Sequence, residues 1–246
     1  SAASDVYKRQ DLCVFGLFGP KSRDVLKTLS KDNFENDQFR FGFAKFITID
    51  GVKIWTQRLS YVGELGYELY VDLKDAKKIY ELLIEKGKDF NLSNCGMHAM
   101  DIMRMESGFL HWGHDISPEE NQYQAGLAFT ISNKKDVDFI GKQALEKIKQ
   151  DKVKTRFSMF TLKESEPGKP LLLHDEPIYD GEKIIGRSTS GNYSFNFKKN
   201  LVFGYINNDF SNEELQNKNL FIEVEKRKYP IELISKPLKQ TNFKDN

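Results

Sequence analysis

The sequence has few of the residues that stabilise exported proteins or anchor chains in membranes. Only two of its 246 residues are cysteine, and neither Cys13 nor Cys95 belongs to a CxxC pair. A disulfide framework and a zinc or redox motif of that type are therefore excluded. The longest apolar run, Leu12–Phe18, is too short to cross a bilayer. We expect a protein of a reducing compartment, the cytoplasm, with no membrane anchor.

An excess of charge of one sign is also missing. Lysine and arginine number 37 and aspartate and glutamate number 36, which leaves a net charge of +1. This balance supplies no field that would hold a phosphate backbone or an anionic membrane. The chain also lacks GxGxxG, GxxxxGK[ST] and GxSxG, so it carries no dinucleotide, P-loop or hydrolase signature. Nucleic acid and membranes are excluded as expected partners.

The residues that are present predict a sheet with helices in the first part of the chain. Hydrophobic side chains make up 39% of the sequence, enough for one large domain or two small ones. Leu12–Phe18 and residues 43–49 read as strands, and Asp50-Gly51 after the second run predicts a tight hairpin. A helix is expected over residues 21–29, with Pro20 at its first position.

Two further helices are expected in this part, over residues 74–88 with Asp72 as N-cap and over residues 97–107. Methionines surround the second of these, which predicts that it is largely buried. After a charge-rich stretch with a short helix at 142–149, the character of the sequence changes near residue 150. Six short strands separated by turn residues then predict a small antiparallel barrel or sandwich.

The first cluster of candidate site residues is Arg58-Leu-Ser-Tyr-Val-Gly-Glu-Leu-Gly-Tyr-Glu-Leu. We expect a strand that bears Arg58 and Tyr61, then a tight turn with glycines on both sides of Glu64. Such glycines let the backbone approach a flat ligand closely, while Glu64 offers acceptors and Tyr61 an aromatic face. The alternative is a plain hairpin with an exposed glutamate.

The second cluster is Gly-Met-His-Ala-Met-Asp-Ile-Met-Arg-Met-Glu at residues 96–106, followed by His-Trp-Gly-His-Asp at 111–115. Asp101 and Arg104 are three residues apart, so an ion pair within the helix is the simplest interpretation. A partly buried Arg104 needs an anionic or carbonyl partner, and a ligand would serve as well as Asp101. His111, His114 and Asp115 admit a metal, but we favour aromatic packing with a polar rim and assign no metal site.

Together these motifs resemble the aminomethyltransferase (glycine-cleavage T-protein) family. The resemblance rests on Tyr-Val-Gly-Glu-Leu-Gly at residues 61–66, on the two motifs at 96–115, on Asp-Phe-Ile-Gly at 138–141 and on Gly-Arg-Ser-Thr-Ser-Gly at 186–191. His-Trp-Gly-His-Asp is similar to the form found in the folate half of dimethylglycine and sarcosine dehydrogenases. The iron–sulfur-assembly branch has Lys-Gly-Cys-Tyr where this chain has Arg-Leu-Ser-Tyr, so that branch is disfavoured.

The resemblance implies an α+β chain that is organised in a family-specific way. It implies a partial folate-binding domain over residues 11–150, with an antiparallel sheet and helices, and a C-terminal antiparallel β-barrel over residues 151–240. Residues 1–10 are expected to be a leader that is foreign to the family, and residues 241–246 a polar tail. The missing beginning of the folate domain is expected to expose apolar surface on the remainder.

The resemblance also implies a ligand and its contacts. Glu64 matches the family glutamate that accepts hydrogen bonds from the pterin edge of tetrahydrofolate, Arg104 matches an arginine that contacts the folate, and Tyr61 would lie beside the ring. The family captures a one-carbon unit from an N-methyl amine or an aminomethyl donor as 5,10-methylenetetrahydrofolate. The family's catalytic aspartate lies further upstream than this chain reaches, so no catalytic residue is assigned.

Three functional hypotheses follow from this resemblance. The first is the folate-binding C-terminal portion of a flavin-dependent dimethylglycine or sarcosine dehydrogenase, whose N-terminal FAD domain lies outside this chain. The second is a fragment of glycine-cleavage T-protein aminomethyltransferase, and the third is a folate-binding module without catalysis. The upstream gene sequence would separate the first two, since only the dehydrogenase should encode a GxGxxG turn.

Overall fold

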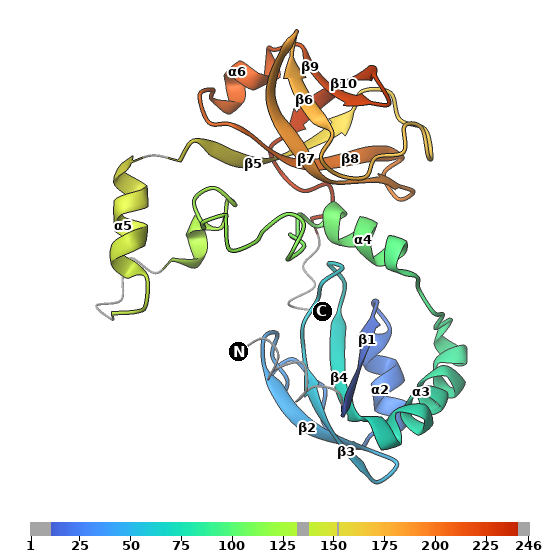
Figure 1. The fold of residues 1–246 in the computed structure, drawn as a ribbon. Helices are drawn as coiled ribbons and strands as arrows, with labels where there is room; N and C mark the ends of the chain where they lie inside the picture. The colour runs from blue at the N-terminus through green and yellow to red at the C-terminus, as the bar shows by residue number, and fades with distance from the viewer. Residues whose placement is uncertain (1–10, 132–137, 152, 241–246) are drawn as a thin grey trace. The chain divides into compact units, whose positions relative to one another are not determined.

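The computed structural model describes residues 11–131, 138–151 and 153–240. The chain forms two compact units, Ser1–Met100 with Gln240–Asn246 and Asp101–Lys239. The first unit contains an antiparallel sheet with helices and the second a closed antiparallel barrel (Figure 1). The predicted α+β class and the order of its two parts are confirmed.

The sheet of the first unit has four strands in the order β1-β4-β3-β2, and all neighbouring pairs are antiparallel. The strands are β1 (Leu12–Phe18), β2 (Ala44–Ile49), β3 (Val52–Gln57) and β4 (Gly66–Asp72). The predicted hairpin joins β2 to β3. Its central residues Asp50 and Gly51 have φ values of 47° and 79°, as a two-residue turn matched to strand twist requires.

Two helices cover one face of this sheet (Figure 1). They are α2 (Ser22–Leu29) and α3 (Leu73–Gly87), and a short 3-10 helix, η1 (Lys88–Phe90), follows α3. Buried side chains from the strands and helices, among them Leu26, Ile54 and Ile79, form one continuous core. Pro20 precedes the N-cap Lys21 and therefore lies in the turn before α2, not at its first position. Asp72 is the N-cap of α3, as predicted.

Helix α4 (Met97–Glu106) was expected to be largely buried, and only its second half is. Met97 is 69% exposed, whereas Met105 is 1% exposed. The difference follows from partners, because residues from Asp101 onward bond to the barrel of the second unit. After α4 come η2 (Ala128–Thr130) and the predicted α5 (Lys142–Asp151).

The second unit is built on a closed barrel with strand order β10-β5-β8-β7-β6-β9, so the barrel alternative holds over the sandwich. A short helix, α6, whose capping box uses Ser211 and Glu214, lies between β8 and β9. The elements are β5 (Thr155–Leu162), β6 (Pro177–Asp180), β7 (Lys183–Ser194), β8 (Lys199–Asn207), α6 (Asn212–Gln216), β9 (Leu220–Val224) and β10 (Arg227–Ile234).

One expectation for the barrel is wrong. Residues 188–191 were expected to form a turn, yet they lie inside the 12-residue strand β7, and Ser188, Thr189 and Ser190 are buried. Their hydroxyl groups all have hydrogen-bond partners. Hydroxyl-rich sequence therefore signals a buried polar contact here, because a satisfied side chain removes the cost of burial.

The border between the compact units lies at Met100 and Asp101, some fifty residues before the predicted domain boundary near residue 150. The second half of α4 and the loop after it group with the barrel because their polar side chains bond to β7. The domain boundary itself stays a prediction. The predicted leader and tail lie outside the described residues.

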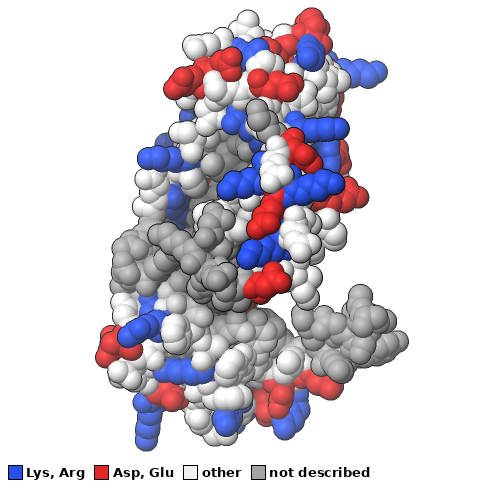
Figure 2. All heavy atoms as spheres, turned by 90° about the vertical axis from the view of Figure 1, so that its left-hand side faces the viewer, with Lys and Arg blue, Asp and Glu red and all other residues white. Residues whose placement is uncertain are grey.

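Figure 2 shows charged side chains of both signs intermingled over one face of the molecule. This pattern agrees with the near balance of 37 basic and 36 acidic residues. That face carries no extended region of one sign.

Candidate functional site

The predicted pterin-binding residues lie in the loop that connects β3 to β4. β3 ends at Gln57, so Tyr61 belongs to this loop and not to the strand on which it was expected. Val62 and Leu65 are each 3% exposed and tie the loop to the core, whereas Tyr61 and Glu64 are partly exposed. The alternation places Tyr61 and Glu64 at the surface of a segment that is anchored on either side of Glu64.

Backbone contacts hold Glu64 in a defined position within this loop. Its amide donates a hydrogen bond of 3.0 Å to the Ser60 hydroxyl. Gly63 before it has a φ of 67°, in the left-handed region that favours glycine. The glycines expected to flank Glu64 therefore have distinct functions, since Gly66 supplies close packing where β4 begins. A Cβ there would lie 2.6 Å from the Leu59 carbonyl oxygen.

Arg58, at the start of the same loop, is buried inside the first unit and is 1% exposed. Its Nη1 donates to the Phe39 carbonyl oxygen at 2.7 Å, and its backbone N–H and C=O bond to residues 43 and 42. Arg58 therefore fixes the loop to the segment that precedes β2. Its role is structural support for the loop that carries Glu64.

Arg104, the third predicted site residue, is the centre of a buried polar network in the second unit. Its side chain is 1% exposed, and all five of its N–H groups are engaged by protein acceptors. Nε and Nη2 donate to Asp101 Oδ1 at 2.9 and 2.8 Å, and Nη2 also donates to Ser190 Oγ at 2.7 Å. Nη1 donates to the Phe109 carbonyl oxygen at 3.1 Å and to Asp115 Oδ2.

The expected Asp101–Arg104 pair is thus present, but it is one part of a larger arrangement. Because guanidinium has only five donors, the protein satisfies Arg104 completely without a ligand. The ring of Phe203 lies 5.4 Å from its Cζ. The geometry favours a positioning role for Arg104, and a direct contact between Arg104 and folate stays a prediction.

Asp115 is the principal acceptor of this network, and sequence reasoning did not find this role. It is 1% exposed, and each of its carboxylate oxygens accepts two hydrogen bonds. Oδ2 accepts from Arg104 and from the His111 amide, and Oδ1 accepts from Thr189 and Ser190. The His111 amide bond closes the turn from 111 to 115. That local closure was the available sequence signal, since an Asp four residues after a loop start often caps it.

Three of the four histidines gather beside this network. The ring centroids of His111 and His114 are 4.6 Å apart, and those of His114 and His174 are 6.0 Å apart. Burial and the neighbouring His114 and Arg104 lower the pKa of His111. Trp112 is 65% exposed, so the expected aromatic packing does not involve its ring. The described residues contain no group of three side chains placed to hold a metal ion.

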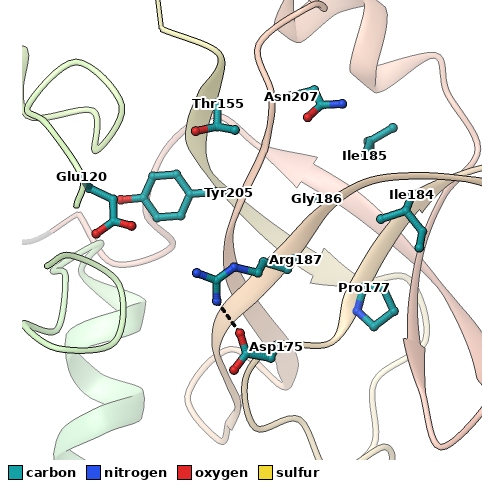
Figure 3. Close-up of a pocket in the computed structure, with 10 residues that line it drawn as sticks. All are labelled: Glu120, Thr155, Asp175, Pro177, Ile184, Ile185, Gly186, Arg187, Tyr205 and Asn207. Atoms are coloured by element: carbon teal, nitrogen blue, oxygen red, sulfur yellow. Dashed lines mark hydrogen bonds and ion pairs between the residues drawn. The ribbon is translucent and has the colours of Figure 1, made fainter.

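A cavity of about 540 Å³ opens on the outside of the barrel (Figure 3). An ion pair between Arg187 and Asp175 lies at one side and Glu120 at another. Burial and nearby carboxylates raise the pKa of Tyr205, whose hydroxyl donates to the Asp115 carbonyl oxygen at 2.8 Å. The lining comprises Glu120, Thr155, Asp175, Pro177, Ile184, Ile185, Gly186, Arg187, Tyr205 and Asn207. None of the predicted site residues is among them.

Arg156 on β5 provides a test of burial energetics. Its Nη1 donates to Asn212 Oδ1 at 2.8 Å, but Nε and Nη2 are buried without a partner among the described residues. Burial lowers its pKa. Since buried unpaired donors cost free energy, we expect Arg156→Met to raise the free energy of unfolding by about 1 kcal/mol. Urea denaturation followed by Trp112 fluorescence checks this, with the exposed Arg227→Met as control. A less stable Arg156→Met variant would contradict the expectation.

Family models match the chain in two consecutive parts. The GCVT N-terminal domain matches residues 5–135, and the glycine cleavage T-protein C-terminal barrel domain matches residues 156–239. The first match alone covers more than half of the chain. The chain therefore belongs to the glycine cleavage T-protein family, and the resemblance stated from its motifs is confirmed.

Relatives come from two classes of enzyme. Human mitochondrial dimethylglycine dehydrogenase is 33% identical over 228 residues, which is 93% of this chain and 26% of that protein. An aminomethyltransferase of Alkaliphilus metalliredigens is 32% identical over 234 residues, which is 95% of this chain and 61% of that protein. Sarcosine dehydrogenases also match. The chain spans about a quarter of the length of the dehydrogenases it matches.

Among solved structures, the glycine cleavage aminomethyltransferase T of Bartonella henselae has a TM-score of 0.79 to this chain at 21% identity. The match covers 93% of this chain and 60% of that one. At this identity the likeness establishes the fold. None of the described helices is long and apolar enough to span a membrane.

Proposed function

We propose that this chain is the tetrahydrofolate-binding C-terminal portion of a flavin-dependent enzyme related to dimethylglycine and sarcosine dehydrogenases. In this proposal the whole enzyme captures a one-carbon unit from an N-methyl amine as 5,10-methylenetetrahydrofolate. The observation that carries the proposal is the β3–β4 loop, in which Glu64 and Tyr61 are presented from a backbone anchored by Val62 and Leu65. The consecutive family matches support it.

The chemistry of the loop fits a pterin. A carboxylate such as that of Glu64 accepts two parallel hydrogen bonds from an amino-pyrimidinone edge, a geometry and strength that an amide cannot reproduce. The Tyr61 ring offers an aromatic surface of matching shape beside it. When bound, tetrahydrofolate would supply the N5 atom that accepts the one-carbon unit. The chain's own contribution is to bind and orient that ring.

For Arg104 we propose an indirect contribution to the site. Its five donors are engaged within the second unit, so it holds the His111–Asp115 turn against β7. A direct contact with folate would require one of these bonds to break. No catalytic residue is proposed among those that the structure describes.

The partners and the location are part of the same proposal. The relatives' greater length is consistent with a further N-terminal domain, and we propose that FAD would bind there. The amine substrate would be oxidised in that domain. We also propose a cytoplasmic location, which is supported by the free thiols of Cys13 and Cys95. The mitochondrial location of two relatives is printed in the names of those proteins.

A second function has specific support. The chain matches 61% of the Alkaliphilus aminomethyltransferase but only 26% of human dimethylglycine dehydrogenase. A fragment of an aminomethyltransferase that takes its one-carbon unit from an aminomethyl donor would give the same matches. The gene sequence upstream separates the two, since a GxGxxG turn there would indicate the dehydrogenase. A full-length protein that binds folate but lacks turnover would indicate the third possibility, a binding module.

Calorimetric titration with tetrahydrofolate tests the role of Glu64. We expect Glu64→Ala to weaken binding by about 1.5–3 kcal/mol, because a pair of charge-assisted hydrogen bonds is lost, with little change in fold stability. The matched control is Glu85→Ala, an exposed glutamate on α3, which should bind as the native chain does.

Equal affinity in the Glu64→Ala and native chains would refute the assignment of Glu64. If the native chain itself does not bind, the titration is repeated with the full-length protein. Absence of binding there would refute the folate proposal as a whole.

A further inference from the structure

The sheet of the first unit has an open face opposite helices α2 and α3 (Figure 1). On this face one side chain from each strand stands in direct register with its neighbours. Val14 pairs with Tyr70, Tyr70 with Trp55, and Trp55 with Phe46. We call these four side chains the aromatic row. Val14, Trp55 and Phe46 are 50%, 37% and 51% exposed, and a continuous apolar surface of this kind marks an interaction site.

The row is flanked on both sides by polar side chains of the central strands. On one side lie Asp72 of β4 and Lys53 of β3, each two residues from a member of the aromatic row. On the other side Glu68 of β4 pairs with Gln57 of β3. All four face outward, because strand residues two apart share a face. The open face therefore has an apolar centre and two polar edges that differ in charge.

The outer strands add small residues at one of these edges. Gly16 of β1 pairs with Glu68, and Ala44 of β2 pairs with Gln57. Bulk is also uneven along the aromatic row, with Val14 at one end and the Phe46–Trp55 edge-to-face pair, 4.9 Å between centroids, at the other. A partner surface that fits this face must place large side chains over Val14 and small ones over Phe46.

We propose that this face binds a second copy of the chain about a two-fold axis that runs parallel to the strands. That axis places β1 of one copy over β2 of the other and β4 over β3. Val14 then meets Phe46 of the second copy, and Tyr70 meets Trp55. The small end of each row lies over the large end of the other, as a self-complementary interface requires.

Charge selects this axis over the perpendicular one. With the axis along the strands, Asp72 meets Lys53 of the second copy twice, and Glu68 meets Gln57, an acceptor opposite a donor. An axis across the strands would lay β4 over β4 and bring Asp72 onto Glu68, two like charges. Like charges in a desolvated interface are unfavourable, so the surface is complementary to itself in one orientation only.

The size of the face sets the strength of the dimer. Four strands about 4.8 Å apart and three rows of side chains give roughly 19 Å by 20 Å, or about 400 Å² from each copy. A total near 800 Å² is at the lower limit for specific interfaces. We therefore infer a weak, reversible dimer with a dissociation constant in the micromolar range or above.

Sedimentation velocity across protein concentrations from about 1 to 300 μM, chosen to bracket a micromolar dissociation constant, tests the proposal. We expect a monomer–dimer equilibrium in the native chain and at least a tenfold larger dissociation constant in Phe46→Lys. Phe195→Lys is the matched control, because Phe195 is a 74% exposed aromatic of the barrel. That variant should dimerise as the native chain does.

A charge swap tests the axis. Lys53→Asp alone should weaken the dimer, because it places two aspartates opposite each other, and Lys53→Asp with Asp72→Lys should restore it. Circular dichroism of each variant verifies that the fold is intact. A native chain that stays monomeric throughout, a dimer insensitive to Phe46→Lys, or a double variant that does not recover would each overturn the proposal.

Discussion

Replacement of Asp115 by alanine should lower the free energy of unfolding of the second unit by about 3–5 kcal/mol. The carboxylate is 1% exposed and accepts hydrogen bonds from Arg104, Thr189, Ser190 and the His111 amide. Its removal leaves a buried guanidinium without its main counter-charge. Three further donors lose their acceptor at the same time, and the free energy cost of an unmade buried hydrogen bond exceeds the gain from a made one.

A double-mutant cycle shows whether the pair acts as a unit. Arg104→Met alone should be similarly destabilising, since Asp115 would then be buried without its cation. The double variant Asp115→Ala with Arg104→Met should lose less than the sum of the two, because neither charge is left unpaired. A fully additive result would show that the two side chains contribute independently. The exposed Glu119→Ala is the control and should change stability by less than about 0.5 kcal/mol.

The two tryptophans allow the measurement to be confined to one unit. Trp55 lies in the first unit and Trp112 in the second. In a Trp55→Phe background, urea denaturation followed by fluorescence reports on the second unit alone. In a Trp112→Phe background it reports on the first, which should be nearly unaffected by Asp115→Ala. This separation matters because a chain of two units need not unfold in a single transition.

Gly66→Ala is the second large effect that we expect, and it falls on the loop that carries Glu64. A Cβ at Gly66 would lie 2.6 Å from the Leu59 carbonyl oxygen and 2.2 Å from the Phe18 ring. The ring can turn, but the backbone oxygen can move only with the loop. We expect a loss of about 3 kcal/mol in the stability of the first unit, the upper end for overpacking.

The same substitution should also weaken tetrahydrofolate binding at least tenfold in the Trp112→Phe background. The reason is displacement of Glu64, two residues away, because a small shift of a positioned group is enough to lose its contacts. Gly96→Ala is a matched control, since a Cβ there meets nothing within 4 Å. Unchanged folate affinity in a destabilised Gly66→Ala protein would mean that the loop does not position the ligand.

The elements with strong local signals were all predictable from the sequence. The β2–β3 hairpin was identified by Asp50-Gly51, which adopt positive φ, and α3 by its apolar spacing. Each depends on interactions between residues near one another in the chain. The motif at residues 61–66 likewise located the candidate ligand loop, but the end of β3 at Gln57 was missed because no breaker residue marks it.

Contacts between distant residues could not be predicted in this way. Arg104 bonds to Ser190 and Asp115 to Thr189, pairs that are 86 and 74 residues apart. From sequence, Arg104 was a candidate ligand contact, Asp115 a candidate metal ligand, and residues 188–191 a turn. These three features belong to one buried network, which forms only when β7 closes the barrel beside α4.

The sequence by itself determined the family, the class of fold and the loop that presents Glu64 and Tyr61, because motifs, turns and periodicity are local properties. The tertiary structure alone decided that Arg104 is fully satisfied by protein acceptors and that Val14, Tyr70, Trp55 and Phe46 form one row. Burial and strand register are properties of the folded chain. They depend on which distant segments meet, and no local pattern encodes that.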